Sequence, residues 1–173
     1  SGIDNSVIAF EKPIYFIKGA PRETLELKKN IHLVLADSDE RTPTKEVVSQ
    51  VQEAMSVDPE KFNAIFSAMG QICHDAKAAL ECGDMEALGN YMNENHLRLQ
   101  EIGVSSKKLD RLVNTAIGHG AHGAKLCGGG KGGFMVAICE EKNQKSIADR
   151  LRTISPQVIE TMVTKEDGYA DIY

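Results

Sequence analysis

The segment KLCGGGKGGFMVA, residues 125–137, contains residue types that could bind a phosphate. Five glycines and Lys131 occupy positions 128–133, directly before a run of apolar residues. Glycine permits positive φ and close approach of the backbone to a ligand, and consecutive exposed amides can form an anion-binding nest. Lys125 and Lys131 would add positive charge. On the loop alone two interpretations stay open: a phosphate-binding loop, or a glycine-rich hairpin without a ligand.

The loop departs from the two common nucleotide-binding motifs. A Walker A loop needs a glycine five positions before its Gly-Lys pair and a Ser or Thr after it, but Lys125 and Gly132 stand there. A dinucleotide fingerprint needs a helix after the glycines, whereas FMVAIC, residues 134–139, is typical of a strand. A phosphate site here would therefore be of a different kind.

A carboxylate near the start of the chain is the second candidate for chemistry. Asp4 lies in SGIDN, between Ile3 and Asn5. An aspartate in such a segment could act as a general base, bind a metal or stabilise a turn, and composition alone favours the turn.

The elements that must position these residues follow from apolar periodicity. Alternation predicts a strand over residues 31–36, and spacings of three and four predict four helices between residues 44 and 118. We expect Thr44 to cap the first helix. After the loop come a strand, a helix and a last strand, so the order predicts an α+β fold with an antiparallel sheet covered by helices on one side.

Composition excludes several classes of function. The 173 residues carry a net charge of −5, which argues against nucleic acid or a membrane surface as the main partner. No apolar run approaches the ~20 residues that span a bilayer, and we expect a cytoplasmic protein. The four cysteines lack metal-ligand spacing, so we expect reduced, mostly buried thiols and no metal site in this chain.

Taken together, these segments resemble one family. SGIDN resembles the P-S-G-[IV]-D-N segment of the mevalonate kinases, and KLCGGGKGG resembles their motif K-[LP]-T-G-A-G-G-G-G. ADSDERTPTKEVVSQV resembles the strand–loop–helix segment with their Thr-Lys pair, and MNENHLRLQEIGVSSKKLDRLV resembles the helix pair before the loop. The whole chain is thus similar to the GHMP small-molecule kinases, and among them to mevalonate kinases.

The resemblance implies a fold, a reaction and cofactors. It implies the GHMP-kinase C-terminal domain, a ferredoxin-like antiparallel sheet covered by helices and preceded by a β-rich arm from the N-terminal domain. Such enzymes use ATP and Mg²⁺ to phosphorylate a hydroxyl of a small metabolite, here the 5-hydroxyl of mevalonate. A homodimer is compatible with the resemblance, and no nucleic acid or membrane partner is implied.

It also implies roles for residues. Asp4 matches the catalytic base, and Thr44 matches a threonine near the acceptor. The substrate-binding set is Ser1, Gly2, Ile3 and Thr44. The phosphate and active-site loop is Gly128, Gly129, Gly130, Lys131, Gly132 and Gly133.

The loop departs from the family pattern at three positions. Cys127 replaces the usual threonine, Gly129 an alanine and Lys131 a glycine. Lys131 could be an extra cation beside the phosphates or extend into solvent, and solvent is the preferred interpretation.

Several parts of the family site have no counterpart in this chain. The nucleotide loop P-x-x-x-G-L-G-S-S, a lysine and a metal-binding glutamate lie upstream of the aspartate segment in the family. We therefore expect residues 1–20 to be a remnant of the N-terminal kinase domain and residues 21–173 to be the C-terminal domain. A missing N-terminal half would complete the enzyme, and this chain alone should be inactive.

Two other functions stay open. Another GHMP kinase, such as a phosphomevalonate kinase, would share the loop and the fold but need more cationic side chains at its acceptor site. A non-catalytic α+β module that binds a small ligand or a partner would turn nothing over.

Overall fold

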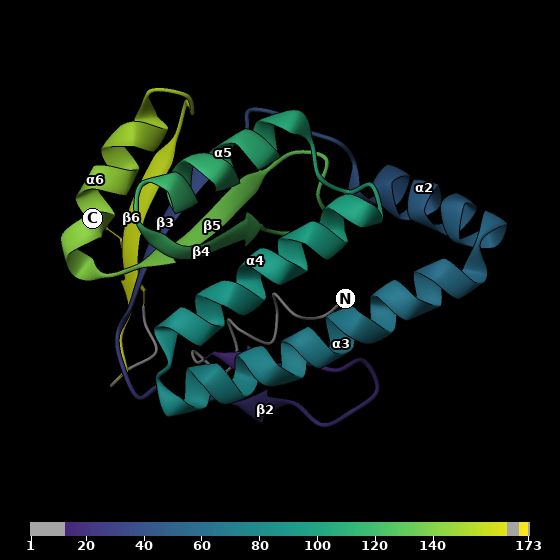
Figure 1. Cartoon of the computed structure of the whole chain (residues 1–173), viewed down its shortest axis with the longest axis horizontal. Coiled ribbons are helices and arrows are strands. Elements are labelled where there is room, and N and C mark those ends of the chain that lie inside the picture. Colours follow the sequence, from purple (N-terminus) through teal and green to yellow (C-terminus); the bar gives the residue numbers. More distant parts are fainter. Residues whose placement is uncertain (1–12, 166–169, 173) are drawn as a thin grey trace.

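The structure is a computed structural model that describes residues 13–165 and 170–172. Helices pack along one side of a sheet, and a small two-stranded arm lies apart from it (Figure 1). The strands are β1 (Ile14–Tyr15), β2 (Glu23–Thr24), β3 (Ile31–Asp37), β4 (Ala121–Leu126), β5 (Phe134–Cys139), β6 (Val158–Val163) and β7 (Ala170–Ile172). The helices are α2 (Thr44–Val57), α3 (Pro59–Cys82), α4 (Met85–Glu101), α5 (Lys107–Gly118) and α6 (Glu141–Arg152).

The sheet has the order β4-β5-β3-β6-β7, and all its pairs are antiparallel. Strands β3, β4, β5 and β6, with helices after β3 and after β5, follow the ferredoxin-like βαββαβ order. The predicted α+β fold and ferredoxin-like sheet are therefore confirmed.

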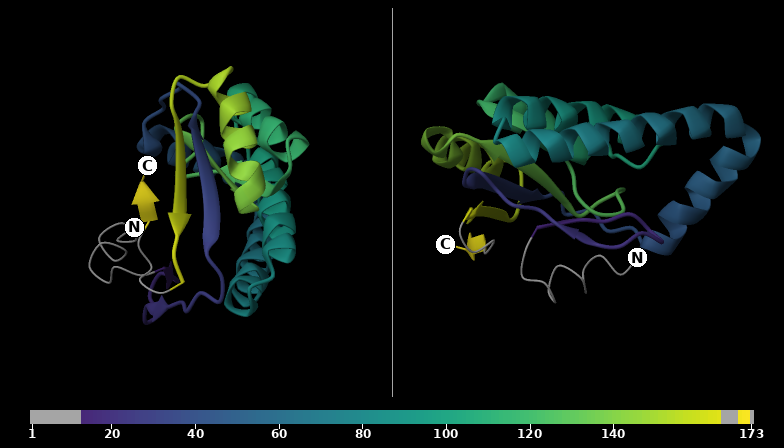
Figure 2. Two further views of the ribbon diagram at one scale, coloured as in Figure 1. Left: turned by 90° about the vertical axis from the view of Figure 1, so that its left-hand side faces the viewer. Right: turned by 90° about the horizontal axis from the view of Figure 1, so that it is seen from below.

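Helices α4, α5 and α6 cover one face of the sheet (Figure 2). The main core lies between these helices and the sheet. Val34 and Ala36 of β3 face these helices, and both side chains are fully buried. Since successive strand residues point to opposite faces, Leu33 and Leu35 point the other way and are only partly buried. The core thus fixes which residues of each strand face away from the helices.

Local signals explain most helix ends. The Asp58 side chain accepts from the Lys61 amide at the start of α3, and Ser106 accepts from the Leu109 amide at the start of α5. Gly83 ends α3 in the left-handed conformation. The expected cap at Thr44 is wrong, because Pro43 occupies the cap position and Thr44 is the first residue of α2.

Strand β4, AHGAKL, is an element that the sequence did not predict. A helix lies directly over it: a Cβ atom built on Gly123 would be 2.0 Å from the Gly89 carbonyl oxygen of α4. Two α4 side chains bond the outer edge of the strand. Asn93 accepts from the Ala124 amide at 2.9 Å, and His96 accepts from the Leu126 amide at 3.3 Å. Tertiary contacts with α4 and β5 therefore define β4, since its own sequence has little strand propensity.

The arm is a hairpin in which Ile14 pairs with Thr24 and Tyr15 with Glu23. It joins residues on both sides of position 20, and the domain division expected there stays a prediction. Among the helices of the described part of the chain, none is long and apolar enough to cross a membrane.

Candidate active site

The glycine loop, residues 127–133, connects β4 to β5. The Cys127 amide donates to the Phe134 carbonyl at 2.8 Å and closes the connection. Gly128, Gly130 and Lys131 all have positive φ, at 83°, 84° and 50°. The predicted need for positive φ is therefore met along this loop, including at one non-glycine residue.

Two neighbouring segments hold the loop in place. The Lys131 amide donates to the Val104 carbonyl at 2.6 Å, and the Gly133 amide donates to the Glu40 carbonyl at 2.9 Å. The Thr42 hydroxyl donates to the Lys131 carbonyl at 2.8 Å. A Cβ atom on Gly130 would lie 2.2 Å from the Val104 carbonyl oxygen, so packing requires glycine there. Part of the glycine content is thus structural, as the hairpin interpretation predicted.

Two other amides of the loop do not bond a neighbouring segment. In the part of the chain that the structure describes, the amides of Gly128 and Gly129 make no hydrogen bond. Gly128 has open space beside its Cα. Because φ is positive at Gly128 and Gly130 but not at Gly129, the segment has the sign alternation of an anion-binding nest.

Thr44 lies against this free part of the loop. A Cβ atom on Gly129 would be 3.3 Å from Thr44 Cγ2 and 3.5 Å from its hydroxyl oxygen. Within the described residues the Thr44 hydroxyl makes no hydrogen bond, so it is available to a ligand. The structure therefore brings together two of the predicted site segments, which are more than eighty residues apart in the sequence.

The segment before Thr44 is fixed at the end of β3. Both carboxylate oxygens of buried Asp37 accept from Arg41, at 2.8 and 2.5 Å. These bonds lower the pKa of Asp37 below its ordinary value, against the opposing effect of burial. The carboxylate also accepts from the Asp39 amide. Asp37 is therefore ionised at neutral pH and orders the turn that bonds the glycine loop.

A buried polar network supports the loop from the side of α4 and α5. The pKa of His96 is lowered because the ring is buried. Neutral His96 accepts from the Leu126 amide through Nδ1, so Nε2 carries the proton and donates to Asp110 at 3.1 Å. Asp110 also accepts from the Ser105 hydroxyl at 2.5 Å. The network joins the end of β4 to the turn that contacts Lys131.

The two lysines of the loop segment have different surroundings. Lys131 Nζ donates to Gln50 Oε1 on α2 and is partly buried, so the expected orientation into solvent is wrong. Lys125 is on β4 and lines a cavity of about 710 Å³. Burial lowers the pKa of Lys125.

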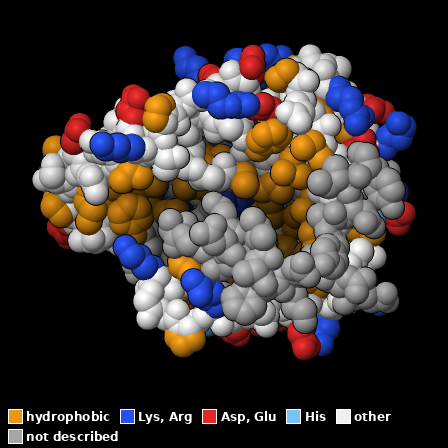
Figure 3. Space-filling view, turned by 180° about the vertical axis from the view of Figure 1, so that it is seen from behind, with side chains coloured by type: hydrophobic (Ala, Val, Ile, Leu, Met, Phe, Trp, Pro, Cys, Tyr) orange, Lys and Arg blue, Asp and Glu red, His pale blue; other side chains and the backbone are white. Residues whose placement is uncertain are grey.

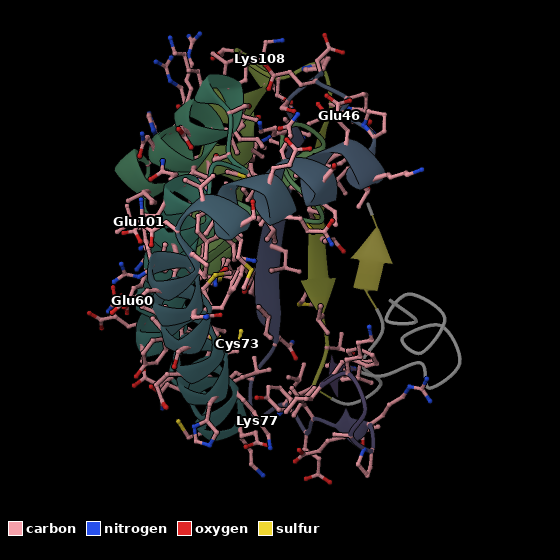
Figure 4. All side chains as sticks on the ribbon, turned by 90° about the vertical axis from the view of Figure 1, so that its right-hand side faces the viewer. Glu46, Glu60, Cys73, Lys77, Glu101 and Lys108 are labelled. Carbon is pink, nitrogen blue, oxygen red and sulfur yellow. The ribbon has the colours of Figure 1, made fainter. Side chains whose placement is uncertain are left out.

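This cavity lies between the arm, α3 and α4. Its walls are mainly apolar, from residues such as Ile14, Ile72, Leu88 and Met92. Figure 3 shows hydrophobic side chains on the side of the molecule away from the covering helices. In Figure 4 Cys73 and Lys77 are labelled on α3, and both residues line the cavity.

Some predictions are not tested or are wrong. Ser1, Gly2, Ile3 and Asp4 lie outside the described residues, so their expected roles stay predictions. The expectation of mostly buried thiols is wrong: Cys139 is buried, but Cys73, Cys82 and Cys127 are exposed. Within residues 13–165 and 170–172, no three His, Cys, Asp or Glu side chains are close enough to hold a metal ion.

Comparison with known proteins agrees with this architecture. Residues 76–156 match the family described as "GHMP kinases C terminal". This chain carries a GHMP kinase C-terminal domain. The match includes α4, α5, the glycine loop and α6, and the GHMP kinase C-terminal domain therefore supplies the loop described above.

Relatives of this GHMP kinase C-terminal domain extend over the full chain. The mevalonate kinase of Thermococcus gammatolerans is 36% identical over an alignment of 173 positions that covers 96% of this chain and 50% of the relative. The crystal structure of L. major mevalonate kinase in complex with R-mevalonate superposes with a TM-score of 0.84 at 27% identity. It covers 99% of this chain and 51% of that structure. The chain thus spans about half the length of the relatives it matches.

A more distant structure shows the same fold. Streptococcus pneumoniae phosphomevalonate kinase in complex with phosphomevalonate and AMPPNP has a TM-score of 0.70 at 13% identity. It covers 88% of this chain and 43% of that structure. The family match and the relative from Thermococcus gammatolerans confirm the resemblance of the sequence to GHMP kinases, with mevalonate kinases among the homologues.

Proposed function

We propose that this chain provides the loop and acceptor side of an ATP-dependent kinase that phosphorylates the 5-hydroxyl of mevalonate. One observation carries the proposal: Thr44 lies against Gly129 of the glycine loop, in a chain whose homologues are mevalonate kinases. Phosphoryl transfer depends mostly on positioning and on neutralising charge, which amides of this kind can do.

The chain's own residues have separate tasks in this mechanism. The free amides of Gly128 and Gly129 stabilise negative charge on the transferring phosphoryl group. The Thr44 hydroxyl, beside Gly129, bonds the acceptor or the phosphoryl group. Asp4 accepts the proton of the acceptor hydroxyl, a role that rests on the resemblance of SGIDN to the family segment.

ATP supplies the phosphoryl group when bound. In the described residues the glycine loop is the site that fits a phosphate, and no group of three or more His, Cys, Asp or Glu side chains there could hold a metal ion. The metal ligands and the rest of the nucleotide site would therefore come from an N-terminal half, and we expect this chain alone to be inactive.

Exposed apolar side chains support a partner of this kind. Val48 is 48% exposed on α2, and Phe66 on α3 is 37% exposed. Together with neighbouring α2 residues and Gly129 they line an apolar hollow of about 230 Å³ beside the loop. Apolar surface next to a phosphate-binding loop is suited to the docking of another domain.

The cavity favours an unphosphorylated acceptor. Its lining contains two cationic side chains, Lys125 and Lys77, and Lys77 donates to Glu23 at 2.6 Å. A phosphorylated acceptor would require more free positive charge. This argues for mevalonate over phosphomevalonate, and the cytoplasmic location stays a prediction.

The test is phosphoryl transfer from Mg-ATP to mevalonate and, separately, to phosphomevalonate. The chain alone is compared with the chain joined to its native upstream sequence. We expect only the longer protein to phosphorylate mevalonate, and Asp4→Asn to reduce its kcat by about 10²- to 10⁴-fold. Asp149→Asn, at an exposed position of α6, is the matched control and should retain full activity. Turnover of phosphomevalonate alone would assign the other kinase, and a longer protein without any transfer would support a non-catalytic module.

A further inference from the structure

Lys125 has a different environment from the other cations near the loop. Its neighbours Ala124 and Leu126 are buried in the main core beneath the helices. Because side chains alternate along a strand, Lys125 points to the opposite side, where it lines the cavity. It pairs with Val136 of β5, one residue before β4 ends. The ammonium group is therefore held by a regular element, not by the loop.

The cavity offers this ammonium no carboxylate. Within the described part of the chain, no Asp or Glu lines the cavity, and Lys125 takes part in no ion pair. Lys125 interacts electrostatically with the thiols of Cys73 from α3 and Cys127 from the loop, and with the His96 ring of α4. Tyr91 from α4 and Tyr15 from the arm also line the space.

An ammonium in such surroundings is costly unless an anion accompanies it. Burial lowers the pKa of Lys125, and a bound anion would raise it again. Among the other described polar residues of the wall, the largely buried Asn95 carries no charge, and Lys77 is paired with Glu23. Within the described residues the cavity therefore combines apolar walls with one unpaired ammonium group, that of Lys125.

We propose that Lys125 binds the carboxylate of the acceptor inside this cavity. The inference rests on the proposed function and adds a residue that determines substrate specificity. Apolar walls suit the methyl and methylene groups of a short branched hydroxy acid, while the ammonium suits its single negative charge. The position of Lys125, two residues before the loop begins, would place the anionic end of the acceptor in the cavity and leave its hydroxyl free to face the loop.

Kinetics on the longer protein test the inference first. Lys125→Met should raise the KM for mevalonate by about 10- to 100-fold, as expected for loss of a charge-assisted bond. Lys125→Arg should recover part of the affinity. Lys142→Met, at an exposed position of α6, is the control and should leave KM unchanged.

A neutral substrate analogue separates binding from a structural effect. For the amide of mevalonate, used as a substrate or a competitive inhibitor, Lys125→Met should change affinity less than twofold, because there is no carboxylate to lose. Equal weakening of acid and amide would overturn the inference, as would a fall in kcat at unchanged KM.

Lysine NMR gives a readout that does not need turnover. In the same protein with ¹³C-methylated lysines, mevalonate should shift the Lys125 signal and raise its pKa, and the Lys142 signal should not move.

If the kinase is active but Lys125 does not respond, the inference fails and the proposed function stands. If mevalonate is not phosphorylated but Lys125 still responds to it, the function fails and the carboxylate site stands. A Lys125 pKa that changes with Asp4→Asn and not with mevalonate would assign its anion to Asp4 and overturn the inference.

Discussion

The glycine loop and the cavity lie on either side of Lys125, and they differ in how they are held. The loop is bonded to two other segments, through Val104 and Glu40, and glycine is required where the backbones meet. The cavity wall includes an arm whose strands are two residues long each. Short hairpins of this kind are marginally stable by themselves. The glycine loop is thus preorganised, while the cavity can open.

The largest expected effect comes from breaking the packing of the loop. Gly130→Ala should lower the free energy of unfolding by about 2–4 kcal/mol, because a Cβ there meets the Val104 carbonyl and the residue is left-handed. Gly128→Ala is the matched control, since φ is similar and no atom lies within 4 Å, and should cost about 1 kcal/mol. Urea unfolding measures both. Equal losses would mean that the contact with Val104 does not determine the choice of glycine.

An intermediate effect is expected from the buried network behind the loop. The lowered pKa of His96 means that the folded protein resists protonation there more than the unfolded chain does. The stabilisation of the fold by neutral His96 is complete above the unfolded pKa of 6.5. It is lost as the pH falls below 6.5 toward the lower pKa of the folded protein. His96→Gln should cost about 1 kcal/mol at pH 7.5 and reduce the loss of stability between pH 7.5 and 5.5.

Urea unfolding at the two pH values checks this prediction. His119→Gln serves as the control, because His119 is exposed at the end of α5 and bonds only the Thr115 carbonyl in the described chain. If His119→Gln reduced the pH dependence as much as His96→Gln, the buried network would not be its source.

The smallest effect is expected at the arm. Lys77 donates to Glu23 and lies 5.1 Å from the centre of the Tyr15 ring, and these contacts raise its pKa. Lys77→Met should speed hydrogen exchange of the arm amides by only a few-fold, since exposed ion pairs contribute little. Exchange at the loop amides should stay unchanged. Faster exchange at both would show that loop and arm open as one unit, contrary to the comparison drawn above.

Sequence reasoning found the loop because its glycines reflect contacts that any fold of this kind must make. It also found the four helices between residues 44 and 118, since apolar periodicity is a local property of the sequence. It missed β4, where only the packing of α4 and the pairing with β5 select a strand. It counted Lys125 among the cations of the loop, because its burial depends on an arm and two helices that are distant in sequence.

The cover that α4 provides for β4 has a consequence for association. A strand at the edge of a sheet normally exposes amides and carbonyls that can recruit a strand from another molecule. Here Asn93 and His96 already bond the outward groups of β4. Growth of the sheet at this edge, as in aggregation or in a dimer with a continuous sheet, would first require the helix to leave. The α4 side chains that bond β4 thus protect the domain from edge-to-edge aggregation.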